Sequence, residues 1–244
     1  MLLTAKNLTA EIAGQRVLTV PNLKLRGGQI TGVIGPNGAG KSSLFWRLVG
    51  GLNGRGEVKF GDGRNPASMK PRELLAEVAL VPQAASDLLV LQSVGAELAA
   101  SDSFAGVAEG TSAGLFGELI GDFDTSLHPR DLSAGQQLAL ALAIQLAKGA
   151  RILLLDEPTR GLDYSAKAVL REALRRLAAT GKSIVVATHD VEFLASIADE
   201  CIHLVDGAVR DHGPAAAVLA KLVQDAPIAW QVTQSALNVH EVTK

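Results

Sequence analysis

The sequence predicts an α/β fold in which a mainly parallel sheet has helices on both faces. From Ile30 onward, short apolar runs typical of buried strands alternate with longer runs typical of helices. The first of these strands, "ITGVIG", runs into a glycine-rich loop, and the helical run "KSSLFWRLVGG" follows directly. Both observations favour parallel strands joined by crossover helices.

The elements expected along the chain fall into three regions. Residues Leu2 to Leu25 show period-2 patches that predict a subdomain of short antiparallel strands, interrupted at Pro21. The strand "VALVPQ" ends at Gln83, and the Ala, Gly and Ser-rich stretch from Ala84 to Arg130 predicts an inserted helical subdomain. Alternation then resumes with a helix from Ala134, strand "RILLLD", a helix from Ser165, strand "SIVVATH", a helix from Val191 and strand "CIHLVDG". One apolar stripe of the helix after Ser165 contains Ala166, Val169, Leu170, Ala173, Leu174 and Leu177.

Composition excludes several function classes. The 244 residues are 48% hydrophobic, enough for a substantial core. With 23 Lys and Arg against 25 Asp and Glu and no basic block, we expect no nucleic-acid partner. The single cysteine, Cys201, excludes an intramolecular disulfide framework and fits a reducing compartment. Polar residues come too early for a signal peptide, and the apolar run "LALALAIQLA" is too short to cross a bilayer, which predicts a buried helix.

The stretch "GPNGAGKSS" matches the P-loop pattern, with Gly35, Gly40, Lys41 and Ser42 at the required spacing. Glycines let successive backbone N–H groups point into one concavity, and the helix start adds partial positive charge. We expect Lys41 to pair with the β- and γ-phosphates, Ser42 to bind Mg²⁺ and Ser43 to add a phosphate contact. The alternative is a turn that merely joins a strand to a helix. The P-loop alone leaves kinases, GTPases and ATPases open, although no NKxD guanine-reading motif occurs.

The strand "RILLLDEPT" ends in two carboxylates, Asp156 and Glu157. Ligands bind at the carboxyl ends of parallel strands, so both acids are expected beside the P-loop. Asp156 suits the Mg²⁺ shell, and Glu157 suits polarisation of an attacking water. Asp-Glu-Pro is also a common polar turn, and His189 could be only a junction residue; at a strand end it could instead sense the γ-phosphate. Gln83, also at a strand end, could touch the metal or the water.

A further stretch, "DLSAGQQ", begins a helix that Ser133 caps. Together with "GPNGAGKSS", "LVPQ", "LLLDEPT", "GLD" and "ATHD" in this order, it makes the chain resemble the ABC-type ATPases that power transporters. The resemblance runs from about Leu2 to Ala220. It implies a P-loop NTPase domain over residues 1–222, with a RecA-like core, an antiparallel β subdomain, a helical subdomain at about 84–148 and a C-terminal extension at 223–244.

The resemblance also assigns the site residues. Glu157, His189 and Gln83 would be catalytic, and Ser42, Gln83 and Asp156 would hold Mg²⁺. ATP would bind on Gly35, Pro36, Asn37, Gly38, Ala39, Gly40, Lys41, Ser42 and Ser43. The partner subunit's ATP would meet the signature Leu132, Ser133, Ala134, Gly135 and Gln136, with a D-loop at Gly161, Leu162 and Asp163. In the family, two such subunits enclose two ATP molecules and contact integral membrane subunits at the cytoplasmic face of the membrane.

Three stretches are similar to the ATPases of energy-coupling factor (ECF) importers for vitamins or metal ions such as cobalt, particularly the second half of tandem actinobacterial forms. They are "VPQAASDLLVLQSVGAELA", "RDLSAGQQLALALAIQLA" and "DEPTRGLDYSAKAVL". Two positions depart from the family. Ile12 stands near the usual adenine-stacking aromatic, and Ala134 replaces the first signature glycine. We expect both to slow hydrolysis without abolishing it. The alternatives are a soluble ABC ATPase of an assembly or repair system and a regulatory module that senses ATP without turnover.

Overall fold

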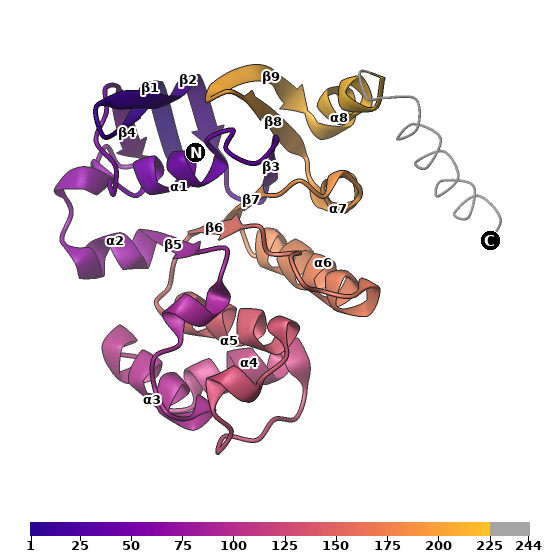
Figure 1. The fold of residues 1–244 in the computed structure, drawn as a ribbon. Helices are drawn as coiled ribbons and strands as arrows, with labels where there is room; N and C mark the ends of the chain where they lie inside the picture. The colour runs from indigo at the N-terminus through magenta and orange to yellow at the C-terminus, as the bar shows by residue number, and fades with distance from the viewer. Residues whose placement is uncertain (225–244) are drawn as a thin grey trace.

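A single sheet organises the molecule, seen in the computed structural model, which describes residues 1–224 (Figure 1). Within these residues the sheet has nine strands in the order β4-β1-β2-β9-β8-β3-β7-β6-β5. The strands are β1 (Leu3–Ile12), β2 (Gln15–Leu25), β3 (Ile30–Ile34), β4 (Glu57–Phe60), β5 (Val78–Val81), β6 (Ile152–Asp156), β7 (Ser183–Ala187), β8 (Glu200–Val205) and β9 (Ala208–Pro214). The predicted α/β fold class is thereby confirmed.

The strands β8, β3, β7, β6 and β5 are parallel, as the alternating pattern predicts. All five residues of β3, β6 and β7 are buried, because helices cover both faces. Asp156 at the end of β6 pairs with Ala187 at the end of β7. The loops that follow these two strands therefore leave the same edge of the sheet.

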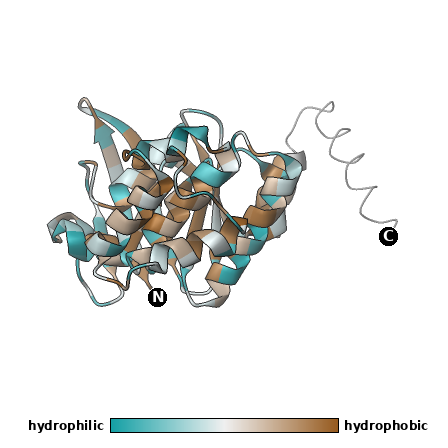
Figure 2. Ribbon diagram, turned by 90° about the horizontal axis from the view of Figure 1, so that it is seen from below, coloured by the Kyte–Doolittle hydropathy of each residue, from teal (hydrophilic) through white to brown (hydrophobic). Residues whose placement is uncertain are grey.

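Helices cover both faces of this sheet, and others form a group of their own. They are α1 (Lys41–Leu48), α2 (Pro71–Glu77), α3 (Val94–Ala105), α4 (Thr111–Ile120), α5 (Ala134–Ala147), α6 (Tyr164–Ala179), α7 (Val191–Ile197) and α8 (Ala215–Gln224). Leu44, Phe45 and Leu48 of α1 pack on one face, whereas apolar residues of α5, α6, α7 and α8 pack on the other. Figure 2 shows hydrophobic residues concentrated in the strands and the helix faces that cover them.

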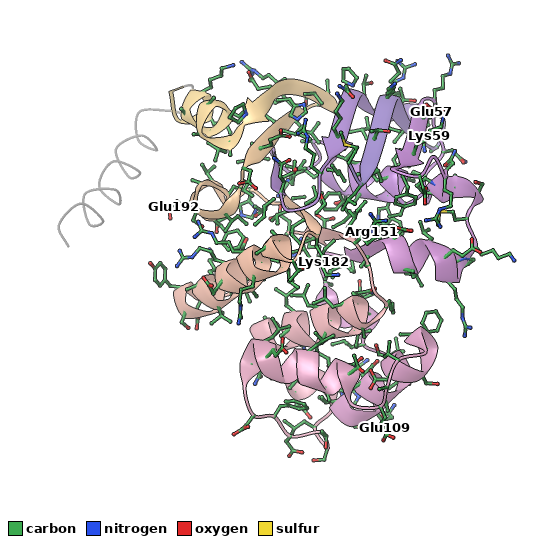
Figure 3. The ribbon with its side chains drawn as sticks, turned by 180° about the vertical axis from the view of Figure 1, so that it is seen from behind. Glu57, Lys59, Glu109, Arg151, Lys182 and Glu192 are labelled. Carbon is green, nitrogen blue, oxygen red and sulfur yellow. The ribbon has the colours of Figure 1, made fainter. Side chains whose placement is uncertain are left out.

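At the opposite, amino ends of these strands, Arg151 and Lys182 precede β6 and β7 (Figure 3). Lys182 Nζ donates to the carbonyl of Ala150 at 2.6 Å, and Arg151 lies 3.6 Å from the carboxylate of Glu77. Burial lowers the pKa of Lys182. These contacts lie at the amino ends of β6 and β7, opposite to the loops that follow Asp156 and Ala187.

The N-terminal antiparallel region differs from its prediction at Pro21. Strand β2 continues through Pro21 rather than breaking there. The register pairs Lys6 with Asn22 and Leu8 with Val20, and the intervening Asn7 adopts a left-handed φ of 48°. On its other side, β2 pairs with β9 only at Thr19, so no ladder hydrogen bond requires an N–H from residue 21.

Helices α3, α4 and α5 form a separate group, at the bottom of Figure 1. Their shared cluster includes Val94, Leu98 and Phe116. Helix α5 belongs to two clusters, because Leu140 and Ala143 face this group whereas Leu138 and Leu142 face the sheet. The predicted burial of "LALALAIQLA" is confirmed. Within residues 1–224, no helix has the length and hydropathy of a membrane span.

The apolar stripe predicted for α6 is only partly buried. Leu170, Ala173 and Leu174 are buried, but Val169 is 52% exposed and borders an apolar groove lined by α4, α5 and α6. The division of the chain into domains stays a prediction. The proposed extension at 223–244 lies outside the described residues except for its first two positions, where α8 ends.

Candidate functional site

The glycine-rich loop between β3 and α1 is held tightly under the β8–β9 turn. A Cβ on Gly35 would lie 2.2 Å from the carbonyl oxygen of Leu204, so only glycine fits there. Gly40, the residue before α1, has a φ of 97°. Gly207 N donates to the carbonyl of Ala39 at 3.2 Å. The sequence pattern thus produces a compact loop at the helix start, the geometry of an anion cradle.

Lys41 extends back over this loop. Its Nζ donates to the carbonyl oxygens of Gly35 at 2.8 Å and Pro36 at 3.2 Å. The same Nζ lies 3.3 Å from Glu157 Oε1, and both side chains are less than 10% exposed. A buried ammonium that is paired with a carboxylate is already positioned where a phosphate would enter.

The two oxygens of Glu157 have different surroundings. Oε2 accepts from the Thr188 hydroxyl at 3.0 Å and the His189 backbone N–H at 3.4 Å, and lies 2.9 Å from His189 Nδ1. Oε1 is buried without a hydrogen bond and has only the ion pair with Lys41. Glu157 itself has a left-handed φ of 48°, a strained conformation for glutamate. The carboxylate is therefore fixed through one oxygen and free to react through the other.

Asp156 lies beside this network. Burial raises the pKa of Asp156 above its usual value and the charge of Glu157 adds to the rise, whereas a hydrogen bond with Ser42 and the charge of Lys41 oppose it. An incoming cation would favour the ionised form. Asp156, Ser42 and Gln83 supply the hard oxygen donors that Mg²⁺ prefers, and all three line one cleft.

Among the described residues, no group of three His, Cys, Asp or Glu side chains could hold a metal alone. Mg²⁺ binds through one or two protein ligands together with water and substrate phosphates, and Asp156 and Ser42 are oxygen donors of this kind in the cleft. The residues present therefore fit the predicted ion.

The cleft has a volume of about 790 Å³. Its lining includes every residue predicted for ATP, metal and catalysis except Gly35 and Pro36, whose carbonyls accept from Lys41. Ile12, 49% exposed, lines it together with Val17, a residue that the sequence pattern did not single out. The structure thus brings together residues from four separate motifs, and their roles are predictions.

The predicted signature does not line this cleft. Ser133 caps α5 in a reciprocal pair, since Gln136 N donates to Ser133 Oγ at 3.3 Å and Ser133 N donates to Gln136 Oε1 at 3.0 Å. Ala134 is exposed, and Leu132 is buried among the helices.

The predicted D-loop lies against this helix start. A Cβ on Gly135 would lie 3.6 Å from Leu162 Cδ2, and one on Gly161 would lie 3.7 Å from Ala134 Cβ. Asp163 caps α6, accepting from Ala166 N at 2.7 Å. The residues predicted as signature and D-loop therefore lie side by side, and their contact with another subunit's nucleotide stays a prediction.

Sequence reasoning missed two further residues of the site. Thr188 joins Glu157 to Thr159, whose hydroxyl lies 3.2 Å from that of Thr188. Arg160 lines the cleft from the turn after β6. Thr188 stands inside the motif "ATHD", and Arg160 stands between the motifs "LLLDEPT" and "GLD".

Comparison with known proteins agrees with this architecture. The sequence model of the ABC transporter family matches residues 18–160. A putative ABC transporter ATP-binding protein of Streptomyces coelicolor is 47% identical over 207 residues, which cover 84% of this chain and 37% of that protein. The cobalt import ATP-binding protein CbiO of Rhodobacter capsulatus is 35% identical over 226 residues, covering 90% of this chain and 81% of that protein.

A solved structure extends the likeness to three dimensions. It is an ATP-binding cassette in a dimeric post-hydrolysis state bound to ADP and Pi, and it matches with a TM-score of 0.74 and 25% identity over 88% of this chain and 99% of that one. The chain belongs to the ABC transporter family. It spans 37% of the length of the Streptomyces relative.

Proposed function

We propose that this chain binds and hydrolyses ATP as one half of a nucleotide-sandwich dimer that drives a membrane importer. The importer would be of the energy-coupling factor type, for a vitamin or a transition-metal ion, with the chain held at the cytoplasmic face by integral membrane subunits. The observation that carries the hydrolytic part is the chain of contacts from Lys41 through Glu157 to His189. The cobalt import protein CbiO, 35% identical, supports the importer part.

Binding begins at the P-loop, where backbone N–H groups and those at the start of α1 donate hydrogen bonds to the phosphate oxygens. Lys41 Nζ lies 3.3 Å from Glu157 Oε1, and a phosphate competes with this carboxylate for the ammonium. Transfer of Lys41 to the phosphates releases Oε1, which has no hydrogen bond of its own. Nucleotide binding thus exposes the base when its substrate is in place.

Glu157 then takes a proton from water through Oε1 as the water oxygen attacks the γ-phosphorus. The bond to the leaving ADP oxygen breaks, and the products are ADP and inorganic phosphate. Thr188 and His189 hold Oε2, so the carboxylate cannot rotate away during this step. When bound, Mg²⁺ neutralises charge on the phosphate oxygens, and Ser42, Asp156 and Gln83 are the residues that would hold it.

The second half of the site would come from another subunit. The start of α5 presents Ser133 and backbone N–H groups at an exposed surface, a suitable partner for a terminal phosphate. The solved dimeric cassette supports a two-subunit arrangement. We propose that this start and the adjoining D-loop face the P-loop of the second ATPase subunit.

Glu157→Gln tests the hydrolytic proposal. The amide keeps the contacts of Oε2 but cannot take a proton, so we expect ATP binding to persist and turnover to fall by about 10²- to 10⁴-fold. Stalled turnover should also accumulate an ATP-bound dimer, measured by light scattering. Glu192→Gln is the matched control, because Glu192 is an exposed residue of α7 outside the cleft (Figure 3). Turnover of Glu157→Gln at the rate of the wild type would refute the role of Glu157.

The importer proposal needs a separate experiment. We expect a tagged chain to recover integral membrane subunits from detergent-solubilised membranes. Recovery of soluble partners alone would favour an assembly or repair ATPase. ATP binding by the assembled complex without any turnover would favour a sensing module.

A further inference from the structure

Arg160 occupies the turn between the proposed base and the D-loop. Its backbone N–H donates to the carbonyl of Glu157 at 3.1 Å, and Leu162 N donates to the carbonyl of Thr159 at 3.2 Å. Thr159 is buried and its hydroxyl meets that of Thr188. The backbone of the turn is therefore fixed, and the Arg160 side chain starts from a defined position.

This side chain borders two clefts at once. It lines the proposed nucleotide cleft and an adjoining cleft of about 110 Å³ that reaches Ala134. Among residues 1–224, Gln83, Glu157 and Arg160 alone line both clefts. Ile12 lines the nucleotide cleft and not the adjoining one.

The guanidinium of Arg160 is exposed, and no other residue among 1–224 pairs with it. The neighbouring cations are engaged, since Lys41 contacts Glu157 at 3.3 Å and Lys167 contacts Asp190 at 2.6 Å. A guanidinium without a partner beside two carboxylates and a P-loop is an unused phosphate ligand.

Charge supports the same conclusion. Asp156 and Glu157 together outweigh the single charge of Lys41 within the cleft, and a nucleoside triphosphate brings several further negative charges. Arg160 supplies a second cation, and its planar donor fork matches two phosphate oxygens at once.

We propose that Arg160 binds the terminal phosphate of the nucleotide in its own cleft and selects triphosphate over diphosphate. This rests on the proposed ATPase function. A nucleotide whose γ-phosphorus lies at Glu157 places its terminal phosphate in the cleft that Arg160 also lines. A diphosphate is one group shorter and leaves the guanidinium unpaired.

The test compares the affinity of the chain for a non-hydrolysable ATP analogue with that for ADP, by calorimetry at concentrations where light scattering reports monomers. Arg160→Ala should lower the ratio of the two affinities about tenfold, the size of one charge-assisted hydrogen bond. Arg160→Lys should retain most of the ratio because it keeps the charge. Arg176→Ala is the matched control, since Arg176 is an exposed, unpaired arginine of α6 outside both clefts.

The outcomes separate the two proposals. Wild-type protein that binds neither nucleotide would defeat the proposed function, and with it the role of Arg160. Nucleotide binding with an unchanged ratio in Arg160→Ala, or an equal loss for both nucleotides, would overturn the role of Arg160 alone. Thermal unfolding of the nucleotide-free variants should match the wild type, because the side chain is exposed.

Discussion

Gly35→Ala is the substitution whose effect follows most directly from the packing of the P-loop. The added Cβ would lie 2.2 Å from the carbonyl oxygen of Leu204 and 3.1 Å from Ala39 Cβ. Relief to 3.0 Å requires the loop or strand β8 to move by 0.8 Å, the difference between the two distances. Overpacking of this kind costs about 1–3 kcal/mol of unfolding free energy. A displacement of about 1 Å in a binding loop can also cost roughly 10²-fold in activity.

Urea denaturation and ATP-binding calorimetry measure both effects. Gly38→Ala is the matched control in the same loop, because its Cβ would meet nothing within 4 Å although its φ is 81°. We expect Gly38→Ala to lose roughly 1 kcal/mol of unfolding free energy, because alanine is strained at a positive φ. It should keep more ATP affinity than Gly35→Ala. Gly35→Ala with the stability and affinity of the wild type would refute the steric argument, as would equal losses in the two variants.

Two other substitutions test the electrostatics and the packing around the site. Asp156→Asn should raise the free energy of unfolding near pH 7. Folding raises the pKa of the Asp156 carboxyl, so the contribution of this group to stability is fully present below its unfolded pKa. That contribution is lost as the pH rises through the folded pKa, and the substitution removes the loss. The gain should vanish below about pH 3.9 in urea titrations, and a constant gain at every pH would contradict this cause. Arg47→Met should lower the free energy of unfolding by about 3 kcal/mol. The buried guanidinium donates hydrogen bonds to the carbonyls of Thr9, Gly54, Arg55 and Gly56. A loss below about 1 kcal/mol would show that water takes over these hydrogen bonds in the variant.

The P-loop and the two carboxylates could be placed from the sequence because their geometry is local. Glycines that admit unusual backbone angles precede a helix start, and Asp156 ends a fully buried strand that Glu157 follows directly. The parallel pairing of β6 with β7 then brings His189 to the same edge. Ile12 reached the cleft as predicted, since it ends β1 at the hairpin.

Other features depend on neighbours that the sequence does not specify. Pro21 stays within β2 because β9 leaves that part of the strand unpaired. Val169 has the periodicity of a core residue, yet it borders the groove lined by α4, α5 and α6. Arg160 resembles any surface arginine until the fold sets its turn beside Lys41 and Gln83. Periodicity reports which face of an element is apolar, but not what covers that face.

Helix α5 is packed on two sides and carries the predicted signature at its N-terminal end. Its 14 residues pack against the sheet through one side and against the helical group through the other. A helix of this length extends about 21 Å, so a tilt of about 10° around its far end would move Ser133 by roughly 4 Å. A tilt of this size would therefore displace the signature by more than the length of a hydrogen bond. No flexible joint between α5 and Ser133 absorbs it, since the capping box ties the two together.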